Sequence, residues 1–193
     1  MPALLAALLA MPCLALTSEA AARPPILREA AGASPLALLS PDVAPGGAIA
    51  LGCVYDESGC RGGNASPALT WNHPPAGTRS FAVLMFDPDA PGGWWHWAVF
   101  DIPAGVTSLR SGAGDPARHL LPVGAIQVRN DFGSMGYGGP CPPPGPPHHY
   151  RLMLYALSVA KLGLGASASA AQVAARVQAS VLARTEIVAL YGR

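Results

Sequence analysis

The chain has 193 residues, enough to bury a substantial core in one domain. Charged residues make up 12% of it, the formal net charge is +1 and Lys161 is the single lysine, so it offers no basic stripe for a nucleic-acid backbone. Glycine (22) and proline (21) are frequent but not periodic, which excludes collagen. Apolar runs lie between them, a pattern that favours many short strands joined by rigid turns.

The N-terminal sixteen or so residues are rich in Leu and Ala, and small residues follow up to Ala22. This pattern predicts a secretory signal peptide over residues 1–22 and a periplasmic or secreted protein. A misassigned start, which would leave the protein cytoplasmic, is the alternative. Residues 23–40 are expected to be a linker and residues 41–193 the folded domain. No apolar stretch is long enough to predict a transmembrane span.

Cleavage of the signal would remove Cys13 and leave Cys53, Cys60 and Cys141. Cys53 and Cys60 flank a short polar loop, which predicts a disulfide between them in an oxidising compartment. Pairing of Cys53 with Cys141 remains open. No C-x-x-C pair occurs, so a cysteine-based metal site is not predicted.

Apolar runs bounded by turn residues predict strands over 48–55, 69–71, 80–86, 94–102, 125–129 and 148–159, with a loop over 105–124. After Ser80, the run 80–86 is continuously apolar, as in a central strand covered on both faces. Val173, Val177 and Val181 recur at helical spacing after Ser169, which predicts a capped amphipathic helix. Residues 185–193 are expected to continue that helix or to form a second short one.

Polar side chains gather in three segments. The first is Asp87-Pro-Asp-Ala-Pro91, directly after a buried strand, where prolines fix the backbone that carries two carboxylates. A structural Asx turn is the alternative. The second is Trp94-Trp-His-Trp97, in which strand alternation would place His96 opposite Trp95 and Trp97. A core histidine bonded to a backbone carbonyl is the alternative here.

The third segment is the Gly- and Pro-rich stretch 138–147, which leads into His148, His149 and Tyr150. Its free amides, two imidazoles and a phenol are donors that suit an anion. The alternative is a polyproline docking segment for a protein partner.

In this order the three segments closely resemble the phosphatidylethanolamine-binding proteins, also called Raf kinase inhibitor proteins, and in particular their bacterial branch. Asn130-Asp-Phe-Gly133 and Tyr191-Gly-Arg193 extend the resemblance, which covers about residues 40–193. It implies a mainly β fold, a Greek-key β-sandwich with one or two C-terminal helices, and a small cavity for phosphate-like or carboxylate groups, including phospholipid head groups. The pocket residues it implies are Asp87, Asp89, Pro91, His96, Gly139, Pro140, His148 and Tyr150.

The function that follows is a non-catalytic binding module for a small anion or phospholipid head group, with no cofactor or metal. If its histidines hold the ligand, affinity should rise as pH falls through about 6.5, the ordinary value of free histidine. One alternative is a secreted kinase or protease inhibitor that acts through its surface. A less favoured one is a hydrolase that uses the Asp/His cluster, with Cys141 near His148 as a nucleophile.

Overall fold

The structure is a computed structural model that describes residues 35–193. The expected signal peptide, Cys13 and residues 23–34 of the expected linker lie outside the described residues. The linker was expected to extend to residue 40, but Ala37–Leu39 form strand β1. These residues pair with Asn72, Trp71 and Thr70 of β2, so the folded domain includes them.

An antiparallel five-stranded sheet with the order β6-β4-β3-β7-β8 forms the framework of the domain. Its strands are β3 (Ser80–Asp87), β4 (Trp94–Pro103), β6 (Ile126–Gln127), β7 (His148–Leu157) and β8 (Val181–Tyr191). Strand β3 lies between β4 and β7, and its residues from Ser80 to Met85 are buried. The prediction of a central strand over 80–86 is therefore confirmed.

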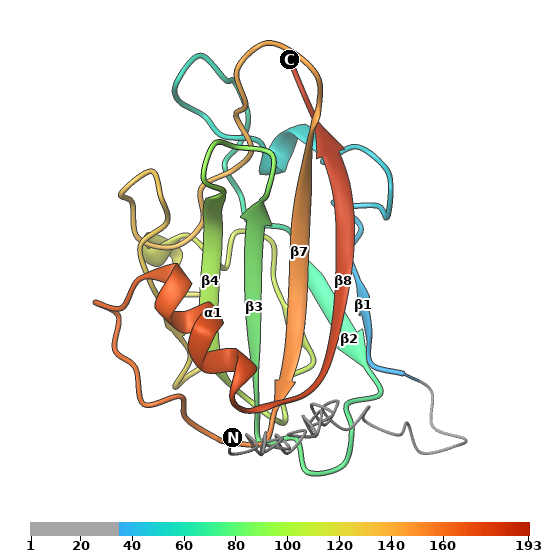
Figure 1. Ribbon diagram of the computed structural model, residues 1–193, viewed down its shortest axis with the longest axis vertical. Coiled ribbons are helices and arrows are strands. Elements are labelled where there is room, and N and C mark those ends of the chain that lie inside the picture. The colour runs from blue at the N-terminus through green and yellow to red at the C-terminus, as the bar shows by residue number, and fades with distance from the viewer. Residues whose placement is uncertain (1–34) are drawn as a thin grey trace, which may run out of the picture. The chain divides into compact units, whose positions relative to one another are not determined.

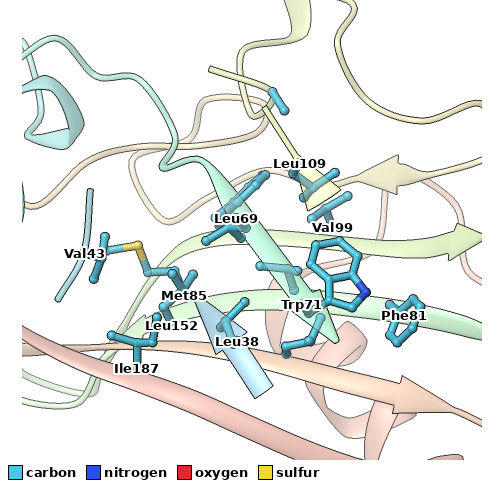
Figure 2. Packing of buried hydrophobic residues seen from close by; sticks show 14 of the residues in the cluster. Leu38, Val43, Leu69, Trp71, Phe81, Met85, Val99, Leu109, Leu152 and Ile187 are labelled. Carbon is cyan, nitrogen blue, oxygen red and sulfur yellow. The ribbon is translucent and has the colours of Figure 1, made fainter. Parts of the chain in front are cut away.

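A second, three-stranded sheet packs on one face of this framework. It has the order β1-β2-β5, with β2 over Leu69–Asn72 and β5 over Ser108–Leu109. Figure 2 shows its apolar side chains meeting those of the larger sheet, and one buried cluster joins the two. Because burial of a Leu- or Phe-sized side chain contributes about 1.5–3 kcal/mol, this cluster is the main source of stability between the sheets.

The opposite face of the larger sheet is covered by helix α1 (Ala170–Gln178) (Figure 1). Ser169 begins the helix through a capping box with Gln172, and the buried Val173 and Val177 pack onto the sheet. The predicted helix and its cap are confirmed, but Val181 belongs to the next strand. The domain is thus mainly β, with two sheets and one α-helix in its described part.

Three sequence-based predictions of secondary structure were wrong. Residues 105–124 were expected to be a loop, but they include strand β5 and the 3-10 helix η2 (Pro116–Arg118). Residues 48–55 do not form a strand: after isolated bridges at Ala48 and Ile49 the chain turns into the 3-10 helix η1 (Leu51–Cys53). Residues 185–191 are not helical but complete β8, which pairs along β7 from Leu157 to His148. The unpaired edge of β7 satisfies their backbone groups, and the alternating Ile187 and Ala189 enter the core.

The antiparallel order brings four strand termini to one end of the large sheet. Asp87 at the end of β3 pairs with Trp94 at the start of β4, and His148 at the start of β7 pairs with Tyr191 at the end of β8. In Figure 1 the β3–β4 loop, the segment entering β7 and the C-terminus gather there. All three polar segments of the sequence meet at this end. In residues 35–193, no helix has the length and apolar character needed to cross a bilayer.

Candidate functional site

A pocket of about 670 Å³ opens at this end of the sheet. Six of the eight residues expected there line it: Asp87, Asp89, Pro91, His96, His148 and Tyr150. The other lining residues are Ser58, Ala90, Trp94, Phe132, Cys141, Pro142 and Pro143. The structure therefore brings residues from five separate stretches of the chain to one cavity.

Asp87 anchors the pocket floor and is 3% exposed. One carboxylate oxygen accepts hydrogen bonds from the backbone N–H groups of Asp89 (2.8 Å) and Ala90 (3.2 Å), so the segment is an Asx turn as well as part of the pocket. The other oxygen lies 2.7 Å from Nδ1 of His148. Because a carboxylate accepts only, Nδ1 of His148 carries the hydrogen, and Nε2 is the ring nitrogen left for a ligand.

A second carboxylate–imidazole pair lies at the mouth. Both the backbone N–H and the Nδ1 of His149 bond to one oxygen of Asp89, at 2.7 and 2.8 Å. The backbone bond first, and then the side-chain bond, holds the pKa of Asp89 below its usual value. Each of the two aspartates of this turn thus bonds to one of the two adjacent histidines, although only His148 lines the pocket.

His96 occupies a β-bulge in β4. Trp97 pairs with Met85 and Trp95 with Phe86, so His96 is an extra residue in the ladder. As a result Trp95 packs in the cluster beneath α1 and Trp97 in the cluster between the sheets. The prediction that both tryptophans share the face opposite His96 was wrong, because strict alternation fails at the bulge.

The ring of His96 is buried and held by the backbone of the Gly/Pro-rich segment. Its Nδ1 lies 2.7 Å from the carbonyl oxygen of Gly138, whose N–H donates in return to the carbonyl of His96 at 2.9 Å. Burial lowers the pKa of His96, so the imidazole is neutral and donates to Gly138. His96 is therefore both a pocket residue and the carbonyl-bonded core histidine considered as its alternative.

Tyr150 closes the floor beside the two histidines. Its ring packs edge-on against His96 (centroids 5.2 Å apart) and roughly parallel to His148 (6.5 Å). Burial, followed by the nearby charge of Asp87, raises the pKa of Tyr150 well above its usual value. The hydroxyl consequently keeps its proton at physiological pH and can donate a hydrogen bond.

Phe132 lines the pocket, although the sequence indicates it only as part of the motif Asn130-Asp-Phe-Gly133. It stacks on Tyr55 (4.2 Å) and packs edge-on against Trp94 (5.2 Å). This contact makes an apolar wall in the pocket that also holds the Asp87–His148 pair. No local pattern identifies Phe132 as a wall residue, because its place depends on contact with Tyr55, 77 positions away in the sequence.

We define the outer wall as residues 54–64 and 138–147, two segments joined by a disulfide between Cys60 and Cys141. The predicted Cys53–Cys60 bond was therefore wrong. Helix η1 turns Cys53 into the core between the sheets, where it is 2% exposed, and it has no disulfide partner among residues 35–193. Burial, with the charge of Asp42 second, raises the pKa of its thiol to about 12.

Gly139 and Pro140 lie at the base of the outer wall, outside the residues that line the pocket. The N–H of Gly139 donates to the side-chain oxygen of Asn64 (2.8 Å), and the carbonyl of Pro140 accepts from Tyr55 (3.1 Å). A Cβ on Gly139 would collide with the carbonyl oxygen of Cys53. Glycine is required here because the two segments approach at backbone distance.

Histidine and aspartate side chains are also common metal ligands. Within the part of the chain that the structure describes, no group of three or more His, Cys, Asp or Glu residues is placed to hold a metal ion. The carboxylates of Asp87 and Asp89 are instead directed to the imidazoles of His148 and His149.

Comparison with known proteins places this geometry in a family. The model of the phosphatidylethanolamine-binding protein family matches residues 39–192. The chain belongs to this family. The UPF0098 protein YbcL of Escherichia coli K12 is 44% identical over 164 residues, which cover 83% of this chain and 90% of YbcL. YbhB of the same organism is 39% identical over 156 residues, covering 80% of this chain and 98% of YbhB.

The crystal structure of E. coli YbcL, described as a new member of the mammalian family, superposes with a TM-score of 0.80 and covers 83% of this chain and 99% of YbcL. LppC of Mycobacterium tuberculosis, named as a candidate lipoprotein, is 37% identical over 164 residues, or 84% of this chain and 75% of LppC. The match with YbcL spans nearly all of that protein, so the shared unit is the whole described domain.

Proposed function

We propose that this chain is a non-catalytic binding module whose pocket takes a small anion, a phosphate or carboxylate group such as that of a phospholipid head group. The Asp87–His148 pair carries the proposal. Asp87 fixes Nδ1 of His148 at 2.7 Å and leaves Nε2 as the nitrogen available to a ligand. The protonated hydroxyl of Tyr150 is a donor on the same floor.

The charge of the lining sets a condition on the ligand. The pocket is lined by Asp87 and Asp89 and by no lysine or arginine. With a neutral imidazole, Nε2 of His148 is an acceptor and the floor repels an anion. Protonation of His148 turns Nε2 into a donor and makes the Asp87–His148 pair neutral overall. Anion affinity is therefore expected to increase as the solution becomes more acidic.

The dimensions of the pocket extend the proposal to organic anions. A volume of about 670 Å³ is typical of small-molecule sites and larger than an inorganic phosphate requires. Trp94, Phe132 and Pro142 give the remaining space apolar walls. A phosphate or carboxylate that carries an organic group would use both the polar floor and these walls.

The state of the cysteines supports a binding role over catalysis. The sulfur of Cys141, the candidate nucleophile beside the pocket, is bonded to that of Cys60. Burial raises the pKa of the Cys53 thiol to about 12, so this thiol stays protonated.

We also propose that the protein is exported to the periplasm or beyond. Disulfides persist in oxidising compartments, and the Cys60–Cys141 bond fits that environment. The relative LppC is named as a candidate lipoprotein, which is consistent with export. Mass spectrometry of the mature N-terminus from a periplasmic fraction tests this: a protein that retains Met1 and stays in the cytoplasm refutes it.

Calorimetric titration of the full chain with phosphate, acetate and phosphoethanolamine, from pH 8 to pH 5, tests the anion site. His148→Asn is compared with His119→Asn, which changes an exposed histidine away from the pocket. We expect saturable binding that strengthens toward pH 5, is lost in His148→Asn and is kept in His119→Asn. Equal affinity across this range would remove His148 from the mechanism. A folded wild type that binds none of the three would refute the anion pocket and favour an inhibitor that acts through its surface.

A further inference from the structure

The outer wall differs from the pocket floor in how it is held. Asp87, His96, His148 and Tyr150 lie on strands of the central sheet, whereas residues 54–64 and 138–147 belong to no sheet. Ser58 and Cys141 nonetheless line the pocket from this wall. Its position relative to the floor must come from interactions other than strand pairing.

The composition of the second wall segment limits which interactions are available. From 140 to 147 the residues are Pro-Cys-Pro-Pro-Pro-Gly-Pro-Pro, so only Cys141 and Gly145 have a backbone N–H. The N–H of Gly145 bonds to the carbonyl of Arg193 at 3.2 Å. Main-chain donors therefore cannot fix the stretch that contacts the pocket, and it depends on bonds made to it from elsewhere.

Two such connections, one covalent and one made by hydrogen bonds, lie on the pocket side of the wall. The first is the Cys60–Cys141 disulfide, with a Cα–Cα distance of 5.9 Å. The second is the guanidinium of Arg193, whose Nε donates to the carbonyl of Pro142 at 2.7 Å and whose Nη1 reaches the carbonyl of Ser58 at 3.5 Å. Arg193 thus connects the same two segments as the disulfide, next to lining residues of both.

We propose that the Cys60–Cys141 disulfide and Arg193 are the positioning elements of the pocket, so that ligand affinity depends on the oxidation state of this cysteine pair. The inference rests on the proposed binding function. Reduction by a dithiol breaks the S–S bond and gives two cysteine thiols, while the dithiol loses two electrons and two protons and becomes a disulfide. Arg193 and the bonds at the base are then the remaining links between the two segments, and the stretch 141–147 is held less firmly against residues 54–60.

The test compares oxidised full-length protein with protein reduced by dithiothreitol, with free thiols counted in each sample. Phosphate and phosphoethanolamine are titrated into both, into Cys60→Ser/Cys141→Ser, and into Arg193→Gln. We expect at least a 10-fold loss of affinity on reduction and in the double variant, a smaller loss in Arg193→Gln, and recovery on reoxidation. Cys53→Ala, which leaves the wall intact, should keep the full redox response.

Hydrogen exchange of the same samples separates the positioning role from the binding function. Reduction should speed exchange at Cys141 and Gly145 and leave the amides of β3 unchanged. If affinity stays within 2-fold on reduction, or if exchange in the wall does not change, the inference is overturned and the anion site stands. If the oxidised protein binds neither probe, the proposed function fails, and the exchange result still decides whether the disulfide positions the wall.

Discussion

Removal of the Cys60–Cys141 bond should lower stability by an amount that follows from its place in the chain. The two cysteines are 81 residues apart. In the chain-entropy treatment, a loop of this length restricts the unfolded chain by about 4.5 kcal/mol at 25 °C. For a domain of 150–250 residues each 1 kcal/mol moves the unfolding midpoint by about 2–4 °C, so the predicted decrease is about 9–18 °C.

Thermal unfolding followed by circular dichroism measures this decrease. Wild type is scanned oxidised and after reduction, beside Cys60→Ser/Cys141→Ser, which should unfold at the same temperature as the reduced protein. Cys53→Ala serves as the control, because it removes a buried thiol but should retain the difference between oxidised and reduced samples. A midpoint that stays within 2 °C when thiol counting shows full reduction would refute the reasoning. It would mean that the unfolded chain gains little freedom or that the bond strains the native wall.

Three further predictions concern buried residues of the pocket and the core. Burial lowers the pKa of His96, so below about pH 6.5 His96 binds a proton in the unfolded chain but not in the folded chain. The free energy of unfolding should therefore fall by up to about 1.4 kcal/mol per pH unit as the solution becomes more acidic. Urea titrations at pH 7.5 and pH 5 measure this slope, which His96→Gln should flatten. Gly139→Ala should lower the free energy of unfolding by about 1–3 kcal/mol and weaken ligand binding, as measured by urea denaturation and calorimetry. Gly105→Ala, at a position with open space around it, should change neither quantity. Leu154 is fully buried, so Leu154→Ala should lower the free energy of unfolding by about 2–5 kcal/mol in chemical denaturation. Leu39 is exposed, and Leu39→Ala should lower it by less than about 0.5 kcal/mol.

The framework of the fold could be predicted because its signals are local. The run 81–86 is apolar throughout, and strand β3 is indeed covered on both faces by two buried clusters. The helix carried its own cap at Ser169 and its own apolar stripe at Val173 and Val177. In these places residue pattern and tertiary environment agree, so the pattern was sufficient.

The errors arise where a distant partner decides the local structure. Residues 185–191 follow a helix closely and could continue it by composition, but the free edge of β7 pairs with all of them. Cys60 likewise lies seven positions from Cys53, yet bonds to a cysteine 81 positions away. The short 3-10 helix η1 turns Cys53 into the core, and no feature of the polar loop between the cysteines indicates that turn.

In the candidate site, too, some features follow from the sequence and others depend on the tertiary structure around a single residue. Its motif residues were identifiable by resemblance, but their directions depend on the bulge at His96. Without that extra residue Trp95 and Trp97 would share one face, and either the cluster beneath α1 or the core between the sheets would lose an indole. The bulge lets both be filled while the imidazole of His96 reaches Gly138 and ties the floor to the outer wall. The geometry of the pocket is thus a consequence of strand register, which sequence periodicity describes only where the ladder is regular.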